Sequence, residues 1–135
     1  MIEIWKLISN FPNYEVSTHG KIRRVGIHRT IKQSICKANP YPFVSIYHKG
    51  RRRVAYVHQL IMETFSSVSP CCLTCGSKKE INHRDGDISH NTFQNLEYVT
   101  REQNLKKKVN QKKRKKRMRE YYQQSPLKHS KVNRL

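Results

Sequence analysis

The positive charge of this chain is distributed unevenly along the sequence, which limits where its core can form. Its 135 residues include 28 Lys and Arg but only 9 Asp and Glu, a formal net charge of +19. Residues 101–135 hold fourteen of the basic and two of the acidic side chains. A segment with so much charge cannot bury itself in an apolar core, so the core must come from the first hundred residues. Nucleic acid, a polyanion that neutralises such charge, is the expected partner.

Several locations and partners are disfavoured by the same composition. No stretch approaches the roughly 18 apolar residues that span a bilayer, and the N-terminus does not read as a signal peptide. We therefore expect an intracellular protein that is not secreted and has no membrane partner. The four cysteines are then expected to be thiols or metal ligands and not disulfides.

Local patterns predict short strands followed by helices. Alternating and β-branched runs predict strands at 14–17, 21–25, 43–48, 51–56, 80–84 and 96–99. Lys49-Gly50 predicts a tight hairpin turn, and Gly20 a turn with positive φ. Apolar spacing predicts a helix over 56–65. A capping box of Thr100 and Gln103 predicts a second helix from Arg101. Residues 111–117 could continue this helix or fray, and disorder is expected beyond Ser125.

A spaced set of polar residues occupies the predicted strand–loop–strand–helix unit. It comprises Val57-His58-Gln59-Leu60, Asn82-His83-Arg84-Asp85-Gly86, His90-Asn91, Asn95-Leu96-Glu97-Tyr98-Val99-Thr100 and Glu102-Gln103-Asn104. This order and spacing resembles the HNH nucleases, in particular the homing endonucleases of phages, group I introns and large DNA viruses. The segment from Glu3 to Arg24 resembles the nuclease-associated modular DNA-binding domain that often precedes this core. The resemblance implies a DNA endonuclease of mobile-element type.

The resemblance also implies residue roles. His83 would be the general base that activates water, and Asn95 would hydrogen-bond to it and orient the ring. Asn82 and Asn104 would each place an amide oxygen on one Mg²⁺ or Mn²⁺ ion, which stabilises the transition state and the departing 3′ oxygen. Several family members have Asp where this chain has Asn82, so we expect weak metal affinity without DNA. His58 is interpreted as structural, His90 as a solvated loop residue, and Asp85 as shaping the turn.

Two further features leave alternatives open. Cys72 and Cys75 look like half of a structural zinc site, but a second ligand pair is missing. The run 112–117 could be a solvated tail, a nuclear localisation signal or an arm that tracks phosphates, and the last is preferred here. The basic residues that we expect to bind DNA are Arg23, Arg24, Arg51, Arg52, Arg53, Arg84, Lys106, Lys107, Lys108, Lys112, Lys113 and Arg114.

The sequence thus predicts an α+β protein with three parts. Residues 1–50 would form a β-rich DNA-binding module, 51–110 an HNH core of the ββα-metal (His-Me finger) type, and 111–135 a basic tail, partly helical or disordered. The expected activity is metal-dependent nicking or cleavage of double-stranded DNA, by a monomer without a small-molecule cofactor, in the host cytoplasm or nucleus if the gene is viral. The alternatives are a non-catalytic nucleic-acid-binding protein on a decayed HNH scaffold, or an RNA-binding accessory, although no RNA-stacking motif is apparent.

Overall fold

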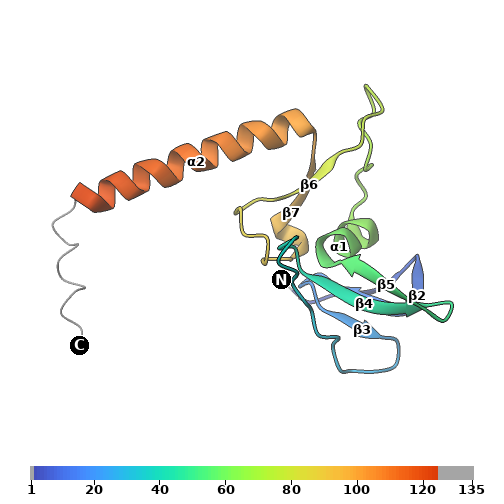
Figure 1. Ribbon diagram of the computed structural model, residues 1–135. Coiled ribbons are helices and arrows are strands. Elements are labelled where there is room, and N and C mark those ends of the chain that lie inside the picture. Colours follow the sequence, from blue (N-terminus) through green and yellow to red (C-terminus); the bar gives the residue numbers. More distant parts are fainter. Residues whose placement is uncertain (1, 125–135) are drawn as a thin grey trace, which may run out of the picture. The chain divides into compact units, whose positions relative to one another are not determined.

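The computed structural model describes residues 2–124 and divides the chain into two units, residues 1–100 and 101–135. The predicted disorder beyond Ser125 lies outside the described residues. The predicted α+β class is confirmed, with three small antiparallel sheets and two α-helices in the described part of the chain (Figure 1). None of the described helices is long and apolar enough to cross a membrane.

The N-terminal sheet is a three-stranded meander of β1 (Trp5–Ile8), β2 (Phe11–Ser17) and β3 (Ile22–Arg24). The predicted strands at 14–17 and 21–25 correspond to β2 and β3, whereas β1 was not predicted as a separate strand. Its burial does not alternate, since only Ile8 is buried, so the period-of-two signal is absent. Gly20 has φ +81° in the turn after β2, as predicted.

The second sheet is the hairpin of β4 (Phe43–His48) and β5 (Arg51–Tyr56), whose bounds match the prediction. Lys49 and Gly50 have φ angles of 51° and 73°, the two successive left-handed residues that a tight hairpin turn requires. The domain boundary predicted at residue 50 falls inside this turn. It therefore separates two strands, β4 and β5, that pair with each other along their whole length.

Helix α1 (Val57–Phe65) supplies the centre of the core. Val57 and Ile61 are fully buried, and Leu60 and Met62 nearly so. The helix contacts β1 and β2 as well as the third hairpin, which consists of β6 (Glu80–His83) and β7 (Leu96–Val99) with a short 3₁₀ turn, η1 (Phe93–Asn95), before β7. α1 therefore lies between the N-terminal strands and this hairpin (Figure 1).

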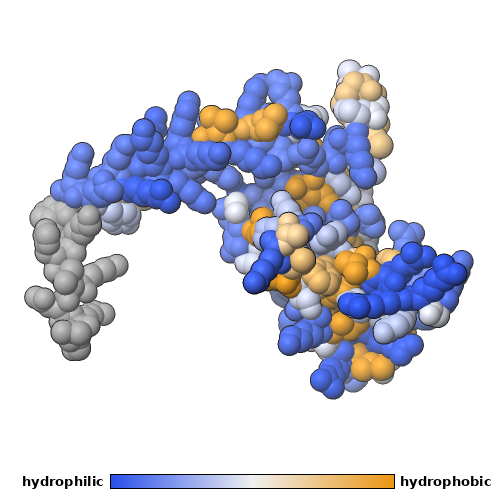
Figure 2. Space-filling view, in the orientation of Figure 1, coloured by the Kyte–Doolittle hydropathy of each residue, from blue (hydrophilic) through white to orange (hydrophobic). Residues whose placement is uncertain are grey.

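Helix α2 (Arg101–Gln124) forms the described part of the second unit. It begins at Arg101 as predicted and continues through 111–117, the stretch for which fraying was the alternative. On the face that Figure 2 shows, its surface is hydrophilic apart from a small apolar patch. Leu105 and Val109 are both half exposed. Residues 111–117 remain helical although they lack an apolar stripe, because Lys, Arg and Gln are good helix formers.

The turn after β2 packs directly on the loop between β6 and β7. The Phe93 amide donates to the Thr18 carbonyl at 2.8 Å. A Cβ atom on Gly20 would lie 2.1 Å from the Asn91 carbonyl oxygen, so only glycine fits there. The N-terminal strands and the polar loop thereby share one packed interface inside the first unit.

We predict that Gly20→Ala destabilises the protein more than Gly26→Ala. Both glycines have positive φ, so each substitution costs about 1–2 kcal/mol of backbone strain. Gly26 faces open space, whereas the new methyl group at position 20 meets backbone and adds a further ~1–3 kcal/mol. Chemical denaturation of the two variants measures the difference, and equal losses of stability would contradict this packing.

Candidate active site

The polar residues of the predicted unit gather on the β6–β7 hairpin. Asn82 and His83 end β6, opposite Glu97 and Leu96 of β7. Four of these polar side chains are buried within the first unit, namely Asn82, His83, Asn91 and Asn95. Buried polar groups are costly unless they are hydrogen-bonded, so this concentration in a small domain marks a built site.

The His83 ring is oriented by Asn91. The His83 Nε2 atom lies 2.8 Å from Asn91 Oδ1, and both side chains are buried. An amide oxygen only accepts hydrogen bonds, so His83 Nε2 carries the proton and the Nδ1 lone pair is left to act as a base. The predicted hydrogen bond from Asn95 to His83 is therefore wrong, because Asn91 occupies that position.

Asn95 instead holds the loop closed. Its Nδ2 donates to Asp85 Oδ1 at 3.0 Å and to the His90 carbonyl at 2.9 Å. Its Oδ1 accepts the Asp85 amide at 3.2 Å. With its donors and acceptor engaged in this way, Asn95 fixes the backbone on both sides of the loop that carries Asn91.

Asp85 shapes the turn, as predicted. Its Oδ1 also accepts the Asp87 amide at 2.8 Å, and Gly86 takes φ +78°. His90 is exposed, as expected of a loop histidine, but its Nδ1 lies 2.6 Å from Asp85 Oδ2. This hydrogen bond is the main cause that lowers the pKa of Asp85 to about 2, so the side chain stays a carboxylate at neutral pH.

Asn82 is held by Glu97, a residue of the predicted motif to which no role had been assigned. Its Nδ2 donates to Glu97 Oε1 at 2.9 Å across the hairpin, which leaves Asn82 Oδ1 as the free oxygen of the amide group. Register was the signal that could have identified Glu97, because the two residues are direct cross-strand partners. Asn82 Oδ1 and the Glu97 carboxylate are the hard oxygen donors that Mg²⁺ and Mn²⁺ prefer.

His58 lies beneath the site on α1. Its ring centroid is 5.7 Å from that of His83 and 4.9 Å from that of Tyr41. Burial, together with the charge of His83, lowers the pKa of His58 to about 4, so the ring is neutral at physiological pH. It is a buried residue, consistent with its structural interpretation.

The other predicted residues divide by location. Asn104 lies on the first turns of α2, in the second unit, and its role as a metal ligand stays a prediction. The arginines of the β4–β5 hairpin are exposed, as are Arg24, Arg84, Lys106, Lys108, Lys112, Lys113 and Arg114. Lys106 pairs with Glu102, and Lys107 is half-buried. Arg23 is partly buried, with its Nε 2.8 Å from Glu15 Oε2 and its guanidinium 3.8 Å from the centre of the Trp5 ring, and its contact with DNA stays a prediction.

The cysteine loop does not assemble a zinc site. Across residues 2–124, no three His, Cys, Asp or Glu side chains are grouped so that they could hold a metal ion. The Cys75 thiol instead lies 2.9 Å from the Ser77 hydroxyl. A structural zinc needs four ligands, so the half-site of Cys72 and Cys75 is not completed in this part of the chain.

Comparison with known proteins finds sequence and fold similarity to HNH endonucleases. Residues 3–47 match the NUMOD4 motif. The chain is 31% identical over 104 residues to the uncharacterized HNH endonuclease L245 of Acanthamoeba polyphaga mimivirus, covering 77% of this chain and 29% of that protein. It is 26% identical over 109 residues to the DNA endonuclease I-HmuI of Bacillus phage SP01, covering 78% and 57%.

The fold is similar to a solved structure of the HNH homing endonuclease I-HmuI described as showing DNA binding and cleavage. The TM-score is 0.67 at 24% identity, over 80% of this chain and 59% of that chain. This chain thus spans less than two thirds of the length of these relatives. The resemblance to HNH homing endonucleases that the sequence predicted is confirmed.

We predict that Asn91→Ala shifts the tautomer of His83. In the wild type, the Asn91 oxygen favours the Nε2–H form, so removal of this acceptor should let the ring populate both neutral tautomers. The ¹⁵N chemical shifts of the His83 ring, assigned with His83→Ala, report this directly. Gln94→Ala, which removes an exposed amide from the same loop, is the control and should leave the shifts unchanged. Identical ring shifts in Asn91→Ala and wild type would refute the assignment.

Proposed function

We propose that this chain, a relative of HNH homing endonucleases, hydrolyses DNA phosphodiester bonds by metal-dependent nicking or cleavage. The observation that carries the proposal is the buried His83–Asn91 hydrogen bond, which leaves His83 Nδ1 as a base. A base of this kind can accept the proton of an attacking water near neutral pH. Asn95 and Asp85 contribute by holding the loop that carries Asn91.

The residues at the end of β6 fit a divalent ion. Asn82 would provide Oδ1, since Glu97 holds its amide nitrogen, and Asn104 would provide a second amide oxygen from α2. A bound Mg²⁺ or Mn²⁺ neutralises charge on the phosphate and on the leaving oxygen. Because the two amides are neutral, affinity for the ion should be weak until the phosphate of DNA adds its own oxygens.

The substrate proposed is double-stranded DNA. The three arginines of β5 and most Lys and Arg residues of α2 are exposed, so they do not contribute to the core. Contacts with DNA phosphates would neutralise their charge. The alternative is a non-catalytic nucleic-acid-binding protein on a decayed HNH scaffold, and a plasmid-nicking assay distinguishes the two.

We expect nicking of supercoiled plasmid in Mg²⁺ or Mn²⁺ and none in EDTA. His83→Ala should lower the single-turnover rate by a factor of about 10²–10⁴, the usual contribution of a general base. His28→Ala, at an exposed loop position, is the matched control and should retain the wild-type rate. Equal rates for wild type and His83→Ala would exclude the mechanism, and binding without nicking by the wild type would favour the alternative.

The run 112–117 should contribute to DNA affinity without selecting sequence. Replacement of its six Lys and Arg residues by Gln, which preserves helix propensity, should flatten the slope of log K against log salt by about 0.9 for each phosphate that the helix no longer binds. The measurement is fluorescence anisotropy with a labelled duplex over a series of salt concentrations, with circular dichroism to verify the helix. An unchanged slope would show that the run does not touch DNA.

A further inference from the structure

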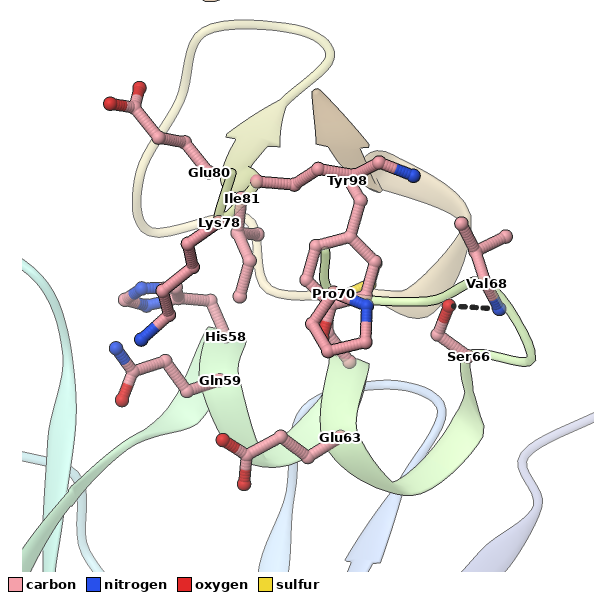
Figure 3. A pocket seen from close by; sticks show the side chains of 12 residues that line it. His58, Gln59, Glu63, Ser66, Val68, Pro70, Lys78, Glu80, Ile81 and Tyr98 are labelled. Carbon is pink, nitrogen blue, oxygen red and sulfur yellow. Dashed lines mark hydrogen bonds between the residues drawn. The ribbon is translucent and has the colours of Figure 1, made fainter. Parts of the chain in front are cut away.

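A cavity of about 540 Å³ opens beside the candidate active site, wholly within the first unit. Its walls come from α1, the segment at 66–79 and the β6–β7 hairpin (Figure 3). Val68, Pro70 and Ile81 line it with apolar surface. This volume lies in the range of sites for small organic ligands, and the mixture of apolar walls with a few polar groups is typical of them.

One acidic side chain that lines the cavity, Glu63, lacks a hydrogen-bond or ion-pair partner among the described residues. Most acidic side chains of the protein are paired, as Glu15 is with Arg23 and Glu102 with Lys106. The Glu63 side chain is exposed and makes no hydrogen bond or ion pair with another described residue, although its negative charge, after burial, contributes to raising the pKa of Tyr98 in the same cavity. Figure 3 shows Gln59 and Glu63 extending from successive turns of α1 into the open space, with Lys78 reaching towards Gln59 from the facing segment.

His58 contributes a buried polar atom to the same cavity. The side chain is only 9% exposed, and its Nδ1 has no hydrogen-bond partner among the described residues. Buried polar atoms without partners are rare, and a role in catalysis is one explanation for them. Because the His58 ring also contacts His83, the cavity lies next to the proposed base.

We propose that this cavity holds one unpaired nucleotide of the substrate DNA whose base carries an exocyclic amine, as cytosine does. The inference rests on the proposed function for the identity of the substrate. The flat faces of the base would pack on the apolar walls, its amine would donate to the Glu63 carboxylate, and Lys78 would contact a phosphate. Thymine presents a carbonyl oxygen where cytosine has its amine, so a carboxylate, which only accepts, disfavours it.

Titration of the full chain with single nucleotides tests the cavity without requiring catalysis. Backbone amide spectra would be recorded with dCMP, dTMP and inorganic phosphate. We expect dCMP to shift Gln59 and Glu63 and to bind about tenfold more tightly than dTMP, the discrimination typical of a single hydrogen bond to a base edge. Glu63→Gln, which turns an acceptor into a group that also donates, should remove most of this preference. Glu120→Gln, an exposed acid on α2, should keep it.

Equal affinity for dCMP and dTMP, or shifts no different from those with phosphate alone, would overturn the proposal. The outcome is independent of the nicking assay. A protein that nicks DNA but shows no preference for dCMP retains the proposed function and loses the nucleotide site. A protein that prefers dCMP through Glu63 but does not nick retains the site and loses the proposed function.

Discussion

Close packing of Gly20 against the carbonyl of Asn91 is the contact on which the candidate site depends. The turn after β2 has no room for a side chain there, and the Thr18 carbonyl accepts the Phe93 amide beside it. The backbone of Asn91 is thereby held against Gly20, while its side-chain oxygen binds the His83 ring. The segment that matches the NUMOD4 motif therefore supports the loop of the nuclease-like hairpin as well as presenting its own basic surface.

A second constraint is the small number of charged side chains in the site on the β6–β7 hairpin. The protein as a whole is strongly basic, yet the site itself relies on neutral amides, with Asp85 and Glu97 each tied by hydrogen bonds. An amide can be buried at lower cost than a charge, although the Nδ2 of Asn91 has no hydrogen-bond partner among the described residues. The result is a preorganised set of donors and acceptors, and in the proposed function the positive charge would come from a divalent ion and from exposed arginines and lysines.

Local sequence signals predicted most of the elements because each had a local cause. Lys49-Gly50 specifies a two-residue hairpin, apolar spacing specifies α1, and the end of β6 was predicted within a residue. Contacts between distant segments were not predictable in this way. Asn91 and Asn95 both lie between β6 and β7, and tertiary contacts rather than local sequence place Asn91 beside His83. The contact of Glu97 with Asn82 depends on strand register, and the contacts of Arg23 with Trp5 and Glu15 are tertiary, so neither was predicted.

In the proposed function, the N-terminal turn positions His83, through Asn91, for hydrolysis. The most direct test of this positioning is the single-turnover nicking rate of Gly20→Ala and Gly26→Ala, measured at a temperature at which denaturation curves show both variants fully folded. Gly20→Ala is expected to nick at least about tenfold more slowly than Gly26→Ala, because small displacements of catalytic groups lower the reaction rate strongly. Equal rates in the two folded variants would contradict it.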